Sequence, residues 1–372
     1  MNRWAWVEVS EAAIEHNVRQ LAAIAAPSRV WAVVKANGYG HGAVASARAA
    51  LAGGAQGLCV ALVQEGVELR DAGVTAPILV LSEQPPETAA TAISAGLTST
   101  VYGAGGIAAL AAAGGRLHPV HLKIDTGMRR VGADPVSAVA IADMIESSPA
   151  VTLAGVFTHL AVADEPGNDF TSEQLRRFDE VLNALSAAGH RPPVVHAANS
   201  AAAMLQPNAR RDFVRAGIAI YGLAPAPSVA SECRELHPAL SLHARVAFVK
   251  QVRAGERISY GLHHRFERDT TVATLPLGYA DGVPRKFQSV GGEVLLGGIR
   301  RPIVGIVTMD QLLVDCGPAG GDERQVAVGD HAVLIGRQGD EEITVADWAQ
   351  QLGVIGYEVV CGLSSRLERR PA

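Results

Sequence analysis

The sequence predicts an α/β protein with an N-terminal (β/α)8 TIM-type barrel followed by a mainly β C-terminal domain. Up to Tyr221, short β-branched runs alternate with alanine-rich helical stretches, which is typical of a parallel sheet that closes into a barrel. After Leu223, short apolar runs are separated by Gly, Pro or Asp, which is typical of antiparallel β structure. A doubly wound open sheet is the alternative for the first part.

The expected elements follow in chain order. A strand at 4–9 leads to Ser10, which is placed to cap a helix with Ile14 and Val18 on one face. The expected barrel strands are 30–35, 57–62, 77–81, 97–101, 120–125, 152–158, 194–197 and 217–221, and the last is expected to begin near Arg215 and Gly217. The expected helices between them are 43–52, 64–71, 87–95, 106–113, 135–146 and 171–188.

Beyond Leu223 the expected strands are 246–252, 271–276, 293–296, 303–306 and 333–335, with a helix at 345–352. We therefore expect a barrel domain at 11–235 and a β domain at 236–372. The N-terminal strand, within 1–10, is expected to join the β domain.

Composition excludes several classes of protein. Hydrophobic residues make up 48% and charged residues 19% of the 372 residues, so a large core is available and global disorder is excluded. The net charge of −5 without a basic patch argues against a nucleic-acid partner. We find no signal peptide, no run that could cross a bilayer, and no metal-binding spacing, so we expect a cytoplasmic protein without a metal. The cysteines form no C-x-x-C pair and are expected to be free thiols: Cys59, Cys233, Cys316 and Cys361.

Lys35 is the first charge after a buried apolar run and stands before a glycine-rich turn, in A-V-V-K-A-N-G-Y-G-H-G. Loss of hydration at the mouth of a strand favours a neutral amine, which can form a Schiff base with an aldehyde cofactor. Gly38, Gly40 and Gly42 allow the backbone to approach another group closely. A solvated lysine after a strand is the plainer interpretation.

Other polar residues cluster where barrel strands end, which is the edge that carries the active site in such barrels. They are Tyr39, Lys123, Asp125, Thr158, His159, His196, Asn199, Ser200 and Tyr221, and Arg215 stands near the start of the eighth expected strand.

Over nearly its whole length the chain resembles the alanine racemase family, whose members are pyridoxal-phosphate (PLP) enzymes with a barrel and a β domain. The motifs that carry this resemblance are A-V-V-K-A-N-G-Y-G-H-G, H-L-K-I-D-T-G-M-R-R-V-G, F-T-H-L-A, N-S-A, R-x-G-I-A-I-Y-G, S-Y-G, G-Y-A-D-G, M-D-Q and G-Y-E-V.

The resemblance implies two catalytic bases. Lys35 would hold PLP covalently and serve one face, and Tyr260, supplied by the other subunit of a homodimer, would serve the opposite face. Racemisation removes the α-proton from one face and returns it on the other, so two bases must flank the cofactor.

The resemblance also assigns contacts. The cofactor phosphate would be held by Tyr39, Ser200, Gly217, Ile218 and Tyr357. Arg215 would face the pyridine nitrogen, His159 would link Arg215 to Tyr260, and His196 would pack beside the ring. The substrate carboxylate would meet Arg130 and the backbone at Met309, and the entrance would be lined by Tyr279 and Arg285.

Three positions vary within the family. Arg129 stands where many relatives have glycine, and Thr308 where some have cysteine. Lys123 matches a lysine that is carbamylated in some members, where the resulting anion orients the residue that matches Arg130. A plain pair of Lys123 with Asp125 is the alternative.

The function implied is an alanine racemase that supplies D-alanine for peptidoglycan. A serine or broad-specificity racemase on the same scaffold is an alternative. A non-catalytic PLP-binding carrier is another, but it leaves the S-Y-G, G-Y-A-D-G and M-D-Q motifs of the β domain unexplained.

Overall fold

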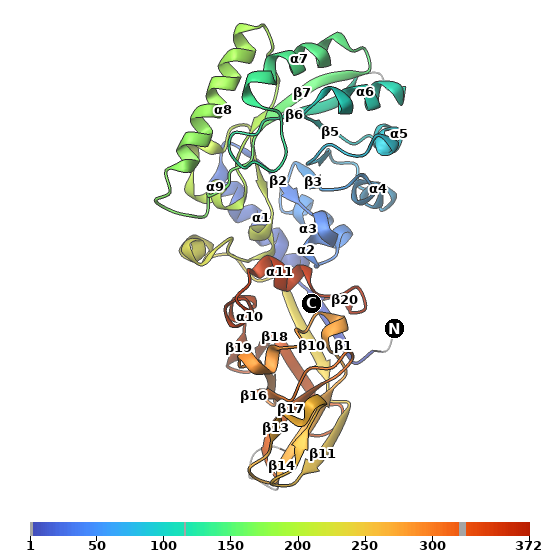
Figure 1. Cartoon of the computed structure of the whole chain (residues 1–372), viewed down its shortest axis with the longest axis vertical. Helices are drawn as coiled ribbons and strands as arrows, with labels where there is room; N and C mark the ends of the chain where they lie inside the picture. Colours follow the sequence, from blue (N-terminus) through green and yellow to red (C-terminus); the bar gives the residue numbers. More distant parts are fainter. Residues whose placement is uncertain (1–2, 115–116, 320–324) are drawn as a thin grey trace. The chain divides into compact units, whose positions relative to one another are not determined.

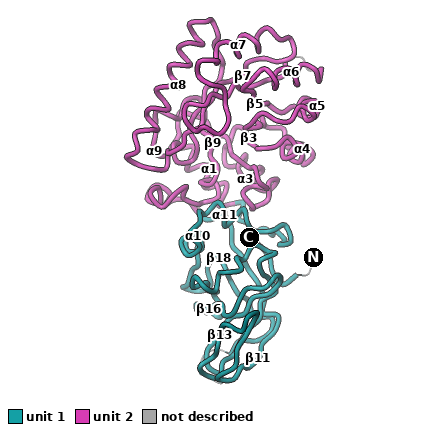
Figure 2. Tube along the Cα trace, viewed as in Figure 1, with its two compact units in different colours: residues 1–11, 238–372 teal, residues 12–237 magenta. Residues whose placement is uncertain are grey.

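The computed structural model describes residues 3–114, 117–319 and 325–372. The chain divides into two compact units (Figure 2). The barrel unit is Ala12–His237, and the β unit combines the described residues up to Glu11 with those of Pro238–Ala372.

The barrel unit alternates strands and helices along the chain. Its main elements are α1 (Glu11–Ala25), β2 (Arg29–Val33), α2 (Lys35–Tyr39), α3 (Ala43–Ala52), β3 (Gly57–Val60), α4 (Val63–Asp71), β4 (Ile78–Val80), α5 (Ala89–Ser94), β5 (Ser99–Val101), α6 (Ala104–Ala112), β6 (His118–Lys123), α7 (Ala138–Ser147), β7 (Val151–Phe157), α8 (Phe170–Ala187), β8 (Val195–His196), α9 (Ser200–Leu205) and β9 (Phe213–Ala216).

The strands pair in parallel as β4-β3-β2-β9 and β5-β6-β7-β8. Thr98 joins the two groups, because its amide donates to the Ile78 carbonyl at 2.8 Å and its carbonyl accepts from the Val80 amide at 2.9 Å. On the other side, the Arg215 amide donates to the Ala198 carbonyl at 3.0 Å. The ring is therefore closed, and helices α4 to α8 lie around it (Figure 1). The predicted (β/α)8 barrel is confirmed.

The eighth predicted strand is wrong. We expected it at 217–221, but β9 is Phe213–Ala216, and Ile218–Tyr221 forms a 3-10 turn. The charge of Arg215 makes β9 look like a poor buried strand, yet Arg215 is buried there because its guanidinium finds partners inside the barrel. Gly217 then leaves the extended conformation (φ −105°, ψ −103°), which ends the strand.

The β unit is built on one long sheet in the order β11-β14-β17-β16-β15-β18-β10-β1-β20, with β19 paired to β18. Its elements are β1 (Ala5–Val9), β10 (Leu240–Arg245), β11 (Phe248–Val252), β12 (Arg257–Ile258), β13 (His264–Arg265), β14 (Thr270–Leu275), β15 (Glu293–Leu296), β16 (Arg300–Val304), β17 (Leu312–Pro318), β18 (His331–Gln338), β19 (Glu341–Ile343), α10 (Val345–Leu352), α11 (Gly356–Cys361) and β20 (Glu368–Pro371). The N-terminal strand β1 pairs antiparallel with β10 and parallel with β20.

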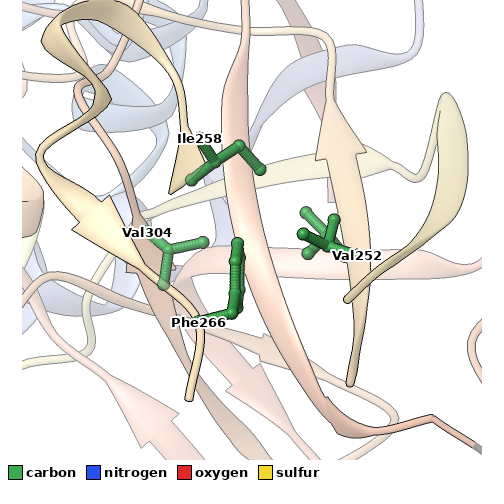
Figure 3. Close-up of a cluster of buried hydrophobic side chains, with 5 residues drawn as sticks. Val252, Ile258, Phe266 and Val304 are labelled. Atoms are coloured by element: carbon green, nitrogen blue, oxygen red, sulfur yellow. The ribbon is translucent and has the colours of Figure 1, made fainter. Parts of the chain in front are cut away.

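A small apolar cluster anchors the hairpin β12–β13 within this unit. Phe266 and Ile258 pack with Val252 and Val304 (Figure 3), and Val272 completes the cluster. Because Ile258 directly precedes Ser259 and Tyr260 in the chain, this cluster sets where that turn begins.

Within the described residues, no helix is both long enough and apolar enough to cross a membrane.

Candidate active site

Lys35 follows β2 and begins a left-handed turn. Ala36, Asn37, Gly38 and Tyr39 all have positive φ, between 51° and 61°. The turn is closed by the Gly38 amide, which donates to the Val34 carbonyl at 2.9 Å. Side chains with a Cβ rarely adopt this conformation, so the surrounding structure must hold the turn in place. As a result, a half-buried Lys35 lies at the carboxyl end of β2 and Tyr39 turns back into the buried interior.

Arg215 lies in β9 with 4% of its surface exposed. Its Nη1 donates to His196 Nδ1 at 2.6 Å, and its Nη2 donates to the carbonyls of Thr158 and Ala197, each at 2.9 Å. His159 Nδ1 lies 3.3 Å from the same Nη2. Arg215 and His159 are therefore in contact, and the role of His159 as a link from Arg215 to Tyr260 stays a prediction.

His121, which the motifs did not single out, extends this network. Its Nδ1 lies 2.9 Å from His196 Nε2. Because a guanidinium can only donate, His196 Nδ1 is an acceptor and its Nε2 carries the proton, which it donates to His121. The alternation of side chains in β6 was the available signal, since His121 and Lys123 are two residues apart and share a face.

Burial and nearby charge keep these histidines neutral. Burial, followed by the charge of Arg215, lowers the pKa of His121 to about 3. The same two causes lower the pKa values of His196 and His159 well below the ordinary value. Burial also lowers the pKa of Arg215, to about 10, which leaves it charged at neutral pH. Arg215 therefore carries the positive charge of this group.

Four of the predicted phosphate contacts lie together. Ser200 Oγ accepts from the Gly217 amide at 2.8 Å, and Ile218 follows directly in the chain. A Cβ on Gly217 would lie 2.6 Å from Tyr39 Oη, so only glycine permits this close approach. Asn199, rather than Ser200, caps α9, because its Oδ1 accepts from the Ala202 amide at 3.0 Å. The fifth predicted contact, Tyr357, is half-buried in α11 of the β unit.

Lys123 is a buried lysine whose charge is opposed by the nearby cations Arg215, Arg130 and Lys35. Its Nζ donates to the Leu81 carbonyl at 3.2 Å and lies 5.4 Å from the centre of the Phe157 ring. The pKa of Lys123 is lowered to about 8, first by burial and then by the charges of Arg215, Arg130 and Lys35, while the charge of Asp125 opposes the shift. A substantial fraction of the Lys123 amine is therefore neutral near pH 8.

The loop after β6 holds Arg129 in a left-handed backbone conformation. Asp125 Oδ1 accepts from the amides of Gly127 at 2.9 Å and Arg129 at 3.0 Å, which folds the loop back on itself. Arg129 has φ of 57°, a conformation that favours glycine over residues with a Cβ. No ion pair between Lys123 and Asp125 is present in the described structure. Arg130 is exposed at the end of this loop.

Tyr260 stands on a rigid turn of the β unit. Ser259 has φ of 64°, and its Oγ donates to the Ile306 carbonyl at 2.8 Å. A Cβ on Gly305 would lie 2.5 Å from Ser259 Cβ, so the two backbones approach closely. The Tyr260 side chain is 69% exposed. The S-Y-G motif therefore presents a tyrosine outward on a fixed backbone.

Two further loops of the β unit are joined through their backbones. The Tyr279 amide donates to the Thr308 carbonyl at 2.9 Å, and the Ala280 amide donates to the Met309 carbonyl at 3.1 Å. Thr308 therefore holds the loop through its backbone carbonyl. Its Oγ also donates to the Gln311 carbonyl at 2.9 Å, which closes the M-D-Q loop.

Asp281 of the G-Y-A-D-G motif is fully buried below Tyr279. Its carboxylate accepts two bonds from Arg3, each 2.7 Å, and one from the Gly278 amide at 3.0 Å. Asp281 therefore holds the G-Y-A-D-G loop to the N-terminal segment, a role that the motif alone did not indicate. Arg285, predicted at the entrance, is exposed in the following turn.

The barrel residues suit an anionic aldehyde cofactor. Lys35, Arg130 and Arg215 are close enough for their charges to act on Lys123, and the absence of a side chain at Gly217 lets its backbone come close to the Tyr39 hydroxyl. Lys35 supplies an amine, Arg215 supplies a guanidinium, and Ser200 and Tyr39 supply hydroxyls. These are the donors that the aldehyde, ring nitrogen and phosphate of PLP require. Among the described residues, no group of His, Cys, Asp and Glu could hold a metal ion.

The chain matches two family models, the alanine racemase N-terminal domain over residues 9–225 and the alanine racemase C-terminal domain over residues 239–371. It is 48% identical over 370 residues to an alanine racemase of Symbiobacterium thermophilum, covering 99% of this chain and 97% of that protein. It is 42% identical to an alanine racemase of Thermobifida fusca over 375 residues, covering 99% and 98%.

A crystal structure of alanine racemase from Bacillus anthracis with bound L-Ala-P superposes with a TM-score of 0.93. Its sequence identity is 39%, with 99% of this chain and 95% of that chain covered. Family models match both units, and the relatives and the solved structure match nearly the whole chain. This chain therefore belongs to the alanine racemase family.

Proposed function

We propose that this alanine racemase interconverts L-alanine and D-alanine with Lys35 and Tyr260 as its two bases. The observation that carries the proposal is a half-buried amine, Lys35, directly after β2, together with the buried guanidinium of Arg215 in β9, the strand that pairs with β2. PLP, when bound, supplies the electron sink for the negative charge that develops at the α-carbon.

The side chains of the protein would transfer the protons and orient the reacting groups. Lys35 accepts or donates the proton on one face of the substrate, and the Tyr260 hydroxyl does so on the other. Arg215 faces the pyridine nitrogen and remains charged, so it donates a hydrogen bond and does not transfer a proton. His196 and His159 are neutral, and they orient Arg215 without adding charge.

The substrate and cofactor contacts follow the family pattern. Arg130 and the Met309 backbone would bind the substrate carboxylate, and Tyr279 and Arg285 would line the entrance. Tyr357 would add a hydroxyl to the phosphate contacts of the barrel.

We further propose that Lys123 is carbamylated. Its lowered pKa, about 8, supports this because carbamylation requires a neutral amine to attack CO2. The carbamate would replace a buried positive charge by a negative one that orients Arg130.

Carbamylation of Lys123 predicts a measurable signal. Protein equilibrated with ¹³C-bicarbonate should show one carbamate carbon resonance, and Lys123→Ala should remove it. Lys250→Ala is the control, because Lys250 is exposed on β11 and should leave the resonance unchanged. A resonance that persists in Lys123→Ala would place the modification elsewhere.

The active site is proposed to be completed by a second copy of the chain, which supplies Tyr260. Support comes from the exposure of Tyr260 on a turn that is held by the hydrogen bond from Ser259 to the Ile306 carbonyl. Leu262, in the same turn, is 54% exposed.

The test is conversion of a panel of L-amino acids by the purified protein, with each D-product measured. Alanine should be converted fastest. Faster conversion of serine would favour a serine or broad-specificity racemase, and no conversion of any amino acid by PLP-loaded protein would favour a carrier. Two further parts of the proposal are that the protein lies in the cytoplasm and that it supplies D-alanine for peptidoglycan. Cell fractionation tests the first, and the second predicts that a deletion strain requires added D-alanine for growth.

A further inference from the structure

The turn that carries Lys35 is strained and needs support from outside itself. Three of its residues with positive φ have a Cβ, namely Ala36, Asn37 and Tyr39. Such residues keep this conformation only where neighbouring groups over-determine it. Part of the support is local, because Asn37 Oδ1 accepts from the Ala43 amide at 2.9 Å.

A second support comes from another element. Glu65, in the first turn of α4, accepts a hydrogen bond at Oε1 from the Ala36 amide at 2.6 Å. Ala36 is the residue directly after Lys35, so this bond fixes the peptide that leaves the lysine. A short bond from an amide to a carboxylate is among the stronger hydrogen bonds in proteins.

The other oxygen of Glu65 holds the neighbouring loop. Oε2 accepts from the Ala61 amide at 2.8 Å and from the Leu62 amide at 3.1 Å, where the chain passes from β3 into α4. One carboxylate thereby joins the loops that follow two adjacent barrel strands. Capping of α4 accounts for the bonds at Oε2, but it does not account for the bond at Oε1.

We infer that Glu65 is a positioning residue that holds the left-handed turn of Lys35 in register with the barrel mouth. The inference rests on the proposed role of Lys35 in alanine racemisation. Glu65 touches neither substrate nor cofactor in this role and acts through the Ala36 peptide. Loosening that peptide would move the Lys35 amine, and small displacements of a reacting group reduce rates strongly.

The experiment separates positioning from capping with three variants of the PLP-loaded enzyme. Glu65→Ala removes both functions. Leu62→Ser with Glu65→Ala restores a helix cap, because serine at the residue before α4 accepts from the amides of its first turn but does not serve Ala36. Glu68→Ala is the matched control, since Glu68 is exposed one turn further along α4.

Three quantities are measured: kcat and KM for alanine, the melting temperature, and hydrogen exchange of peptides covering 35–42 and 61–71. In Glu65→Ala we expect kcat to fall about tenfold or more with little change in KM, and both peptides to exchange faster. In the double variant, the melting temperature and the 61–71 peptide should return toward the wild-type values, while kcat stays low and the 35–42 peptide stays fast. Glu68→Ala should match the wild type.

Recovery of kcat and of the 35–42 peptide in the double variant would show that Glu65 acts as a cap alone and would overturn the inference. Wild-type kcat and exchange at 35–42 in Glu65→Ala would also overturn it. If the wild-type enzyme itself does not racemise alanine, the proposed function fails, while hydrogen exchange at 35–42 still decides whether Glu65 holds the turn.

Discussion

At the scale of single residues, Arg215 shows how a charge is accommodated inside the barrel. An unpaired buried charge is strongly destabilising, but Arg215 donates to two carbonyls and to His196 within 3.0 Å. The surrounding histidines are held neutral by burial and by Arg215 itself. The protein therefore presents one permanent positive charge at this point and no competing proton donor with an ordinary pKa.

Lys35 is predicted to be the lysine that binds PLP. Treatment of the enzyme with borohydride, followed by peptide mapping, should place a pyridoxyl group on Lys35. Lys35→Ala should lose both the label and nearly all racemisation, because the amine is both the attachment point and one base. Lys250→Ala should keep both, and a label found on Lys123 or Lys250 in the wild type would contradict the assignment.

At the scale of elements, His190 connects the end of α8 to α7. His190 Nε2 lies 2.8 Å from Asp143 Oδ1, and Nδ1 lies 3.0 Å from Glu146 Oε2. Burial by itself lowers the pKa of His190, but the hydrogen bonds and charges of Glu146 and Asp143 outweigh it, so the pKa is raised. The protonated imidazolium therefore links the two helices.

The raised pKa predicts a stability that depends on pH. The contribution is fully present below the ordinary histidine pKa, where His190 is protonated in both states, and is lost as pH rises through the raised value. The difference in free energy of unfolding between wild type and His190→Gln should be larger at about pH 5.5 than at about pH 9. Chemical denaturation at both values measures it, and an equal difference at both would show that His190 does not titrate in this way.

The apolar cluster at the hairpin β12–β13 predicts a second effect on an element. Phe266→Ala should lower the free energy of unfolding by about 3–5 kcal/mol, because a large, fully packed side chain is removed. Phe248→Ala on β11 is the matched control; Phe248 is 56% exposed, and its loss should change stability by about 0.5 kcal/mol or less. Thermal unfolding measures the stability of the two variants, Phe266→Ala and Phe248→Ala. Similar losses of stability in both would mean that the cluster does not hold the Tyr260 turn.

At the scale of the whole molecule, the central prediction is that each active site is shared between two chains. Lys35→Ala and Tyr260→Phe should each be nearly inactive alone. Co-refolding them in equal amounts should give about half mixed dimers, each with one intact and one doubly damaged site, so roughly a quarter of wild-type activity should return. The measurement is racemisation by the refolded mixture, with each variant refolded alone as control.

If Tyr260 served its own chain, every site in the mixture would carry one lesion and no activity would return. Recovery should also depend on mixing before refolding, because dimers already formed would exchange chains slowly. Recovery by simple mixing of folded variants at the first time point would argue against a stable shared dimer.

The sequence predicted the architecture well because strand and helix periodicity are local properties. Most predicted barrel elements agree with the structure within a few residues; α3, for example, is Ala43–Ala52, as expected. The error at β9 arose because contacts between distant parts of the chain, and not local patterning, decided that strand. Local composition penalised Arg215 within a strand, whereas its partners come from strands distant in the chain.

The site residues were predicted by motif resemblance, which singled out Lys35, Arg215 and Ser200, and their roles stay predictions. The resemblance gave no indication of Glu65, because the residue directly before α4 is Leu62, and a capping motif is recognised by a Ser or Thr at that position. Nor did it indicate that His121 would meet His196, which is 75 positions away.

By itself, then, the sequence determined the class of fold, the two-part organisation and the residue types that carry the chemistry, because these follow from patterning along the chain. Only the tertiary structure decided the partners: the guanidinium of Arg215 with His196, the hydroxyl of Ser200 with Gly217, and the carboxylate of Glu65 with Ala36. The physical reason is that hydrogen bonds and pKa values depend on distance and burial, which exist only once barrel closure has brought separate loops to one edge.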